Sequence, residues 1–149
     1  MGLHFLDTSA LAKLYIKEPG SEEMLAIARN PANRLAVLSV AQAELHSALR
    51  RRQRHGDLPA DETEHATALA TRHFYTRYLR QVVSDLVVDR ACVLLQRHPL
   101  RAYDAVQLAA CLVLSKTTEE ALLFVCSDRG LLNSAKAEGL KIWDPTHPA

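Results

Sequence analysis

Four acidic residues of this sequence stand beside apolar runs, where a carboxylate is costly. The chain has 17 Asp and Glu residues, and most of them occur in polar stretches typical of solvent-facing acids. A carboxylate that loses its hydration costs several kcal/mol unless a cation or hydrogen-bond donors compensate. The exceptions to the polar pattern, and therefore the candidates for a chemical site, are Asp7, Glu44, Asp104 and Asp128.

The expected positions of these acids suggest metal chemistry. Asp7 and Asp128 directly follow predicted strands, and open α/β sheets place their sites at that edge. Glu44 and Asp104 fall in the first turns of predicted helices. Four converging carboxylates would repel one another unless divalent cations lay between them, and oxygen ligands suit Mg²⁺ or Mn²⁺. Taken singly, the same acids also suit plain helix caps and first-turn positions.

The elements that must position these acids alternate between strand and helix. Apolar runs predict strands at 3–6, 35–39, 122–126 and 140–143. Helical patterns and stop signals predict helices at 7–17, 21–29, 41–55, 61–83, 90–97, 102–114 and 128–138. Segment 84–88 fits either a short strand or a continuation of the preceding helix. Buried strands that alternate with helices predict an α/β fold with a parallel sheet covered on both faces.

Length and composition fit one soluble domain over residues 1–149. The chain is 48% hydrophobic and 23% charged, and it has no run of about 20 apolar residues that would cross a membrane. The N-terminus reaches Asp7 too soon for a signal peptide, so a cytoplasmic protein is expected. The net charge is only +1, and any nucleic-acid binding must rest on local patches. Apolar neighbours predict buried free thiols at Cys92, Cys111 and Cys126.

Four segments resemble the signatures of a known family. In order, they are FLDTSALAKLY at 5–15, SVAQAEL at 39–45, LRAYDAVQLA at 100–109 and SDRGLL at 127–132. Together they resemble the PIN-domain nucleases, and among these the toxin ribonucleases of VapBC-type toxin–antitoxin pairs. The resemblance implies a three-layer α/β/α fold with a mostly parallel sheet of four to five strands.

The resemblance also implies a chemistry for the site. It matches Asp7, Glu44, Asp104 and Asp128 to acids that bind one or two Mg²⁺ or Mn²⁺ ions. The implied reaction is hydrolysis of RNA phosphodiester bonds with 5′-phosphate and 3′-hydroxyl products. Three hydroxyl residues match positions that orient the carboxylates or the waters of the metal, and the same residues also read as plain helix caps: Thr8, Ser9 and Ser127.

Two macromolecular partners and a homodimer are expected. Arg50, Arg51 and Arg54 end the helix of Glu44, and they either grip the RNA backbone or form a solvated helix end. The family implies a cognate VapB-like antitoxin whose C-terminal segment covers the active site. Tyr15 and Leu11 are candidates for this contact, with core packing as the other use of each.

Two other functions remain open from the sequence. The first is a phosphoryl-transfer enzyme with Asp7 as its covalent nucleophile, but such enzymes usually carry a second Asp two residues on, and here that residue is Ser9. The other is a catalytically silent PIN-like module that binds proteins, against which the intact set of acids argues.

Overall fold

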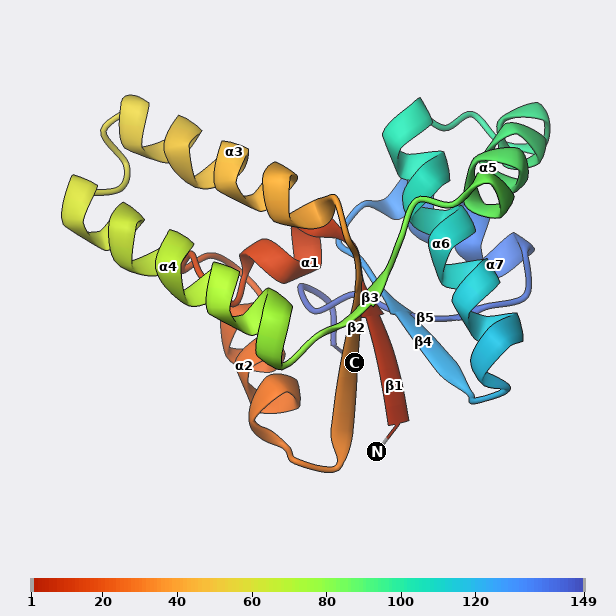
Figure 1. Ribbon diagram of the computed structural model, residues 1–149, viewed down its shortest axis with the longest axis horizontal. Helices are drawn as coiled ribbons and strands as arrows, with labels where there is room; N and C mark the ends of the chain where they lie inside the picture. The colour runs from red at the N-terminus through yellow and green to blue at the C-terminus, as the bar shows by residue number, and fades with distance from the viewer. Residues whose placement is uncertain (1, 149) are drawn as a thin grey trace.

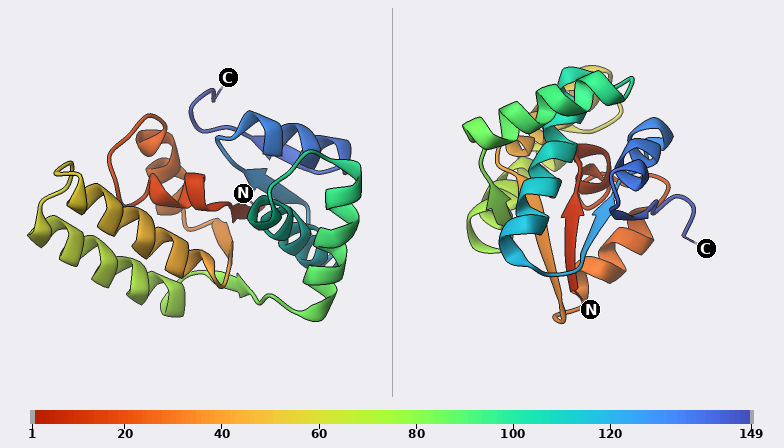
Figure 2. Two further views of the ribbon diagram at one scale, coloured as in Figure 1. Left: turned by 90° about the horizontal axis from the view of Figure 1, so that it is seen from above. Right: turned by 90° about the vertical axis from the view of Figure 1, so that its right-hand side faces the viewer.

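A five-stranded sheet with all strands parallel forms the centre of the computed structural model, which describes residues 2–148 (Figure 1). Its order is β3-β2-β1-β4-β5. The strands are β1 (Gly2–Leu6), β2 (Asn33–Leu38), β3 (Leu79–Gln81), β4 (Leu122–Val125) and β5 (Lys141–Trp143). The predicted α/β fold class is confirmed, because the sheet is parallel and helices pack on both of its faces (Figures 1 and 2).

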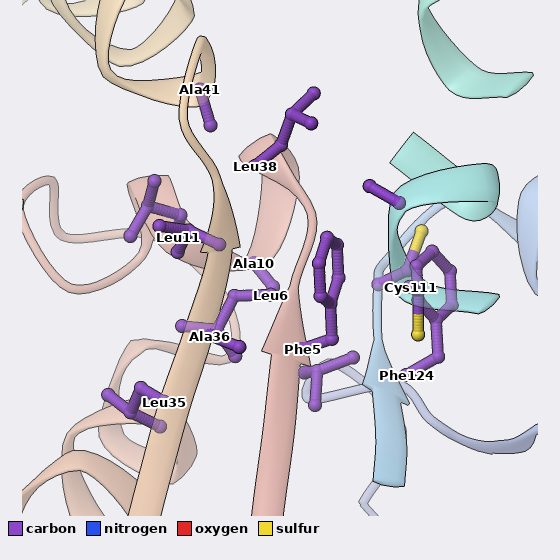
Figure 3. Close-up of a cluster of buried hydrophobic side chains, with 14 of the residues drawn as sticks. Phe5, Leu6, Ala10, Leu11, Leu35, Ala36, Leu38, Ala41, Cys111 and Phe124 are labelled. Carbon is purple, nitrogen blue, oxygen red and sulfur yellow. The ribbon is translucent and has the colours of Figure 1, made fainter. Parts of the chain in front are cut away.

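The inner strands are apolar because both faces of the sheet are covered. Consecutive side chains of a strand point to opposite faces, and Figure 3 shows Phe5 and Leu6 on opposite sides of β1. Phe5 stacks on Phe124 of β4 with 6.1 Å between ring centroids, and both rings are fully buried. This packing fixes β1 beside β4, so the residues that follow these two strands emerge next to each other.

Seven helices connect the strands over the described residues. They are α1 (Thr8–Ala12), α2 (Ser21–Arg29), α3 (Ala41–Arg54), α4 (Ala60–Thr76), α5 (Asp85–Arg97), α6 (Ala102–Thr118) and α7 (Arg129–Ala137). Helices α3 and α4 lie side by side as a hairpin that extends away from the sheet (Figures 1 and 2). Between residues 2 and 148, none of the helices has the length and apolarity needed to cross a membrane.

Four local predictions were wrong. The helix predicted over 61–83 ends at Thr76, and β3 follows it at Leu79–Gln81. Segment 84–88 is neither strand nor continuation, because Ser84 caps the new helix α5 by accepting from the Val87 amide. The helix predicted over 7–17 ends at Ala12. Cys92 is exposed, whereas Cys111 and Cys126 are buried as expected, because Cys92 lies on the solvent side of α5.

Chain connectivity marks one edge of the sheet as the place for a site. From β1 the chain moves to β2 and β3 on one side, and it then crosses back to β4 on the other side of β1. In open parallel sheets, ligands bind outside the carboxyl ends of the strands at such a switch point. Two acids lie next to that point. Asp7 directly follows β1, and Asp128 lies three residues beyond Val125, the last residue of β4.

Candidate active site

Asp7 joins the end of β1 to the start of α1 and is 6% exposed. Its amide donates to the Val125 carbonyl at 3.1 Å, which extends the pairing of β1 with β4 by one residue. Its carboxylate caps α1, with Oδ1 accepting from the Ala10 amide at 2.9 Å. The Ser9 hydroxyl donates to the same Oδ1 at 2.7 Å, so Oδ2 accepts neither of these bonds. Asp7 thus directly follows a strand and caps a helix, as the sequence predicts.

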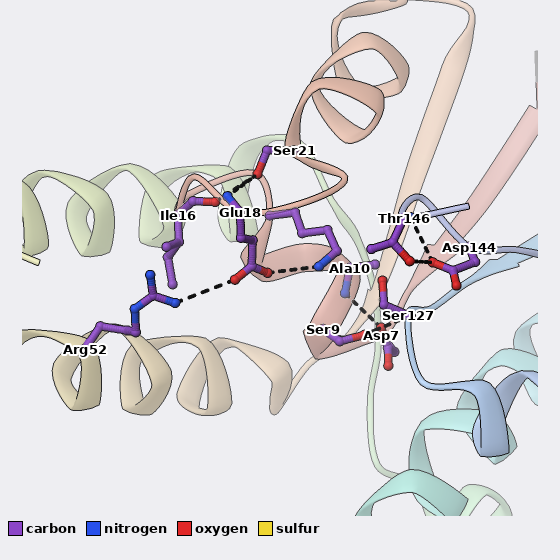
Figure 4. Close-up of polar contacts among 11 residues, drawn as sticks. Asp7, Ser9, Ala10, Ile16, Glu18, Ser21, Arg52, Ser127, Asp144 and Thr146 are labelled. Carbon is purple, nitrogen blue, oxygen red and sulfur yellow. Dashed lines mark hydrogen bonds and ion pairs between the residues drawn. The ribbon is translucent and has the colours of Figure 1, made fainter. Parts of the chain in front are cut away.

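Asp128 occupies the equivalent place on the neighbouring strand. It caps α7, with Oδ1 accepting from the Leu131 amide at 2.9 Å, and its side chain is exposed. Gly130 leaves room for this carboxylate, since a Cβ there would lie 3.3 Å from Oδ1 of Asp128. The Ser127 amide donates to the Ser9 hydroxyl at 3.1 Å, which connects the ends of β4 and β1 (Figure 4).

Asp104 and Glu44 reach the same edge from helices. Asp104 lies in the first turn of α6 and is half-buried, while Glu44 lies in the first turn of α3 and is exposed. The apolar stripe predicted beside Asp104 is buried against the core at Ala105, Leu108, Ala109 and Leu112. That packing holds the start of α6 over the ends of the strands.

The electrostatics of the two central acids reflect their surroundings. Burial raises the pKa of Asp7, bonds from Ala10 and Ser9 offset part of this rise, and the Asp104 carboxylate raises the pKa further. Burial also raises the pKa of Asp104. The carboxylates of Asp128 and Glu44 raise it further, and the Arg101 guanidinium lowers it. Asp104 is thus the acid that interacts with each of the other three.

The oxygen atoms of the site are of the kind that a hard divalent cation prefers, but the acidic side chains lie too far apart to hold one ion as they stand. Carboxylate and hydroxyl oxygens surround Asp7, and the Ser127 hydroxyl oxygen is buried with no hydrogen-bond partner. Within residues 2–148, however, no group of three or more His, Cys, Asp or Glu side chains lies close enough to hold one ion. Glu44 and Asp128 are exposed, and only Oδ1 of Asp128 is held, by the Leu131 amide. The Glu44 carboxylate and Oδ2 of Asp128 are therefore the groups that a cation would draw toward Asp7 and Asp104.

Two residues of the site were missed by the sequence reasoning. Tyr103 and Gln107 lie one helical turn apart on α6, and both contact the Thr8 hydroxyl. Burial raises the pKa of Tyr103, and the carboxylates of Glu44 and Asp7 add to this rise. Gln107 is 1% exposed. The available signal was a lone amide in the otherwise apolar run from Ala105 to Ala110.

The three arginines predicted to bind RNA lie at the far end of α3. Arg50 pairs with Glu64 of α4 at 2.8 Å, and Arg51 and Arg54 are exposed. Arg51 lies seven residues beyond Glu44, or about 10 Å along the helix. The arginines therefore border the site along one helix rather than surround the acids, and their contact with RNA stays a prediction.

A hollow of about 430 Å³ lies beside the hairpin of α3 and α4. Apolar side chains line most of it, including Leu14, Tyr15 and Leu58, and the carboxylates of Asp61 and Glu62 border it. Leu11 is fully buried in the core, so only Tyr15 of the two expected contact residues faces this hollow.

Comparison with known proteins agrees with this arrangement. A family model described as PIN domain matches residues 4–136, a range that includes all four acids. The chain belongs to the PIN domain family. No curated protein sequence is similar enough to this PIN domain to count as a match.

Solved structures share the fold of this PIN domain at low sequence identity. VapC20 of Mycobacterium tuberculosis, described as a sarcin-ricin loop cleaving toxin, is 17% identical with a TM-score of 0.65, covering 92% of this chain and 95% of that one. A chain of a Klebsiella pneumoniae toxin–antitoxin complex is 17% identical with a TM-score of 0.63, covering 95% and 97%. A chain of Rickettsia felis VapBC2 bound to a promoter DNA fragment is 15% identical with a TM-score of 0.62, covering 95% and 98%.

Proposed function

We propose that this PIN domain, taken as one domain over residues 1–149, is a metal-dependent endoribonuclease and the toxin of a toxin–antitoxin pair. The observation that carries the proposal is that Asp7 and Asp104, 97 positions apart in the sequence, reach the same edge of the sheet. The hydroxyls of their neighbours Thr8 and Tyr103 lie 3.2 Å apart, and the Asp104 carboxylate adds to the rise in the pKa of Asp7 that burial causes. Two acids in a shared, partly buried site favour binding of a cation. The fold shared with VapC20, a toxin described as cleaving the sarcin-ricin loop, supports RNA as the substrate.

The residues of the chain divide the work in this proposal. Asp7 and Asp104 hold a Mg²⁺ or Mn²⁺ ion, with Glu44 and Asp128 as further ligands once their side chains turn inward. Such an ion activates water near neutral pH and offsets the charge that develops on the phosphate. Ser9 donates to the Asp7 carboxylate, and the Ser127 amide in turn holds the Ser9 hydroxyl. Thr8 acts through Tyr103, the neighbour of Asp104. Cleavage is expected to leave 5′-phosphate and 3′-hydroxyl ends.

The hollow beside the α3–α4 hairpin suits the antitoxin. Its apolar lining with two carboxylates at the border fits an apolar segment that carries Lys or Arg. A basic side chain of that segment could also reach the four acids, because one guanidinium can replace the charge of a metal. The chains similar to this one in the Klebsiella pneumoniae and Rickettsia felis structures come from such complexes, which supports an antitoxin partner.

The experiment compares cleavage of RNA by purified protein in Mn²⁺ and in chelator. The variants are Asp7→Asn and Asp104→Asn, which remove a charge and keep the size of the side chain. Asp89→Asn is the matched control, because Asp89 is an exposed acid of α5 away from the site. We expect the two site variants to lose cleavage at least a hundredfold and the control to keep it. Cleavage that persists in either site variant contradicts the assignment.

The alternative of a silent protein-binding module makes a different prediction. Calorimetric titration with Mn²⁺ separates the two functions, because a silent module has no need to bind the ion. We expect wild type to bind Mn²⁺ and Asp104→Asn to bind it at least tenfold more weakly. Absence of binding by wild type favours the silent module.

A further inference from the structure

Three polar side chains form a triangle where the start of α1 meets α6. The Thr8 hydroxyl lies 3.2 Å from the Tyr103 hydroxyl. The side-chain amide nitrogen of Gln107 donates to both, at 3.0 Å to Thr8 and 3.1 Å to Tyr103. Thr8 is 95 and 99 positions away from its two partners, so the triangle joins distant parts of the chain.

Two corners of the triangle are direct sequence neighbours of the two central acids. Thr8 follows Asp7 directly, and Tyr103 precedes Asp104 directly. Each of these acids is therefore one peptide bond away from a corner of the triangle. Any change in the triangle would shift the first turn of α1 against the first turn of α6, and with it the separation of the two carboxylates.

Gln107 lowers the stability of the fold at this position, because it buries a polar atom without a partner. It is 1% exposed, it lies among fully buried residues of α6, and its amide oxygen has no hydrogen-bond partner. A buried polar atom without a partner lowers the stability of the folded chain. An apolar side chain would avoid this cost, so stability alone does not explain the amide. Residues that lower stability are typical of functional sites.

The hydroxyl hydrogens of the triangle are not all used. Both hydrogens of the Gln107 amide nitrogen are donated, and one of the two hydroxyls donates to the other. One hydroxyl hydrogen is then left over. Burial raises the pKa of Tyr103, and the carboxylates of Glu44 and Asp7 add to this rise, so two of the four acids act electrostatically on this corner of the triangle.

We propose that Thr8, Tyr103 and Gln107 are positioning residues that set the separation of Asp7 and Asp104 for a shared divalent cation. This inference rests on the proposed function and deepens it. It assigns no contact with the reacting atoms to the triangle. Its consequence is that loss of one corner weakens binding of the cation without a matching loss of stability.

The test measures the affinity of the full chain for Mn²⁺ by calorimetry, with the thermal unfolding midpoint without metal as a second readout. Thr8→Val and Gln107→Met remove hydrogen-bonding groups while keeping similar volumes, and Tyr103→Phe removes one hydroxyl. We expect each to weaken Mn²⁺ binding about tenfold or more, within the range usual for residues that orient metal ligands. We expect Gln107→Met to unfold at or above the wild-type midpoint.

Two control variants separate positioning from general damage. Thr8→Ser keeps the hydroxyl and is expected to bind Mn²⁺ nearly as wild type does. Tyr75→Phe removes a phenol hydroxyl from an exposed tyrosine of α4, away from the triangle, and is expected to change nothing.

The outcomes distinguish this inference from the function on which it rests. If wild type binds Mn²⁺ and the three corner variants bind it equally well, the positioning role is wrong and the metal site stands. Weak binding by Thr8→Ser equal to that of Thr8→Val also overturns the inference, because the hydroxyl would not matter. If wild type fails to bind Mn²⁺, the proposed function and this inference fall together.

Discussion

The amide of Ser127 donates a hydrogen bond of 3.1 Å to the hydroxyl of Ser9, and the two residues are 118 positions apart. The same Ser9 hydroxyl makes a second hydrogen bond, which it donates to Oδ1 of Asp7. One small side chain therefore links the end of β4, the end of β1 and the most buried acid of the site.

Replacement of Ser9 by Ala is expected to lower both stability and metal affinity. The variant leaves the Ser127 amide without its acceptor and Asp7 without its hydroxyl donor. We expect a loss of about 1 to 2 kcal/mol in the free energy of unfolding, measured with urea. Ser47→Ala, at an exposed serine of α3, is the control. If both variants unfold at the same urea concentration, the connection through Ser9 contributes nothing.

Replacement of Asp7 by Asn is expected to stabilise the protein in a pH-dependent way. The raised pKa values of Asp7 and Asp104 mean that the folded chain holds these protons more tightly than the unfolded chain. Their contribution to stability is therefore complete below about pH 4 and is lost as the pH rises through the raised values. Asp7→Asn removes this loss at Asp7, and its Oδ1 can still accept from the Ala10 amide.

Calorimetric unfolding in chelator across the acid and neutral range tests this prediction. We expect the midpoint of Asp7→Asn to exceed that of wild type by a few degrees at neutral pH and to approach it in acid. Asp89→Asn serves as the control. A variant that is less stable than wild type at neutral pH would contradict the prediction. It would show that the ionised carboxylate stabilises α1 as a cap by more free energy than its burial loses.

Removal of the arginines at the end of α3 is expected to weaken RNA binding in a salt-dependent way. Each contact with a single-strand phosphate contributes about 0.7 to the slope of log affinity against log salt concentration. The triple variant Arg50→Ala, Arg51→Ala, Arg54→Ala should therefore lower that slope, measured with catalytically inactive Asp104→Asn protein. Arg29→Ala, at the opposite end of the sheet, is the control. An unchanged slope in the triple variant refutes the contact.

We predict that the expected homodimer forms through an apolar face of α5 and α6. Leu86 is 64% exposed there and borders a groove with Leu112 and Val113. We expect Leu86→Lys to weaken self-association about tenfold or more, because the interface would bury a charge. Leu95→Lys is the matched control, since Leu95 lies on the opposite flank of α5 at 100° per residue. Sedimentation velocity that finds equal association for wild type and Leu86→Lys rules out this face.

Much of the fold could be predicted because its signals are local. The inner strands are runs of apolar residues, and α2 was predicted with its observed ends at Ser21 and Arg29. By contrast, β3 is a strand of three partly exposed residues, Leu79–Gln81, at the edge of the sheet. Its extended conformation comes from pairing with β2 and not from an apolar pattern of its own. The sequence therefore predicted a helix over these residues.

The sequence by itself determined which side chains can do chemistry and that Asp7 and Asp128 each follow a buried strand, because caps and buried strands are properties of short segments. Only the tertiary structure decided the rest. Packing of α6 on the sheet brings Asp104 to Asp7, and it brings Tyr103 and Gln107 to Thr8. These relationships depend on contacts between residues about a hundred positions apart, and no local pattern records which distant segment a helix will face.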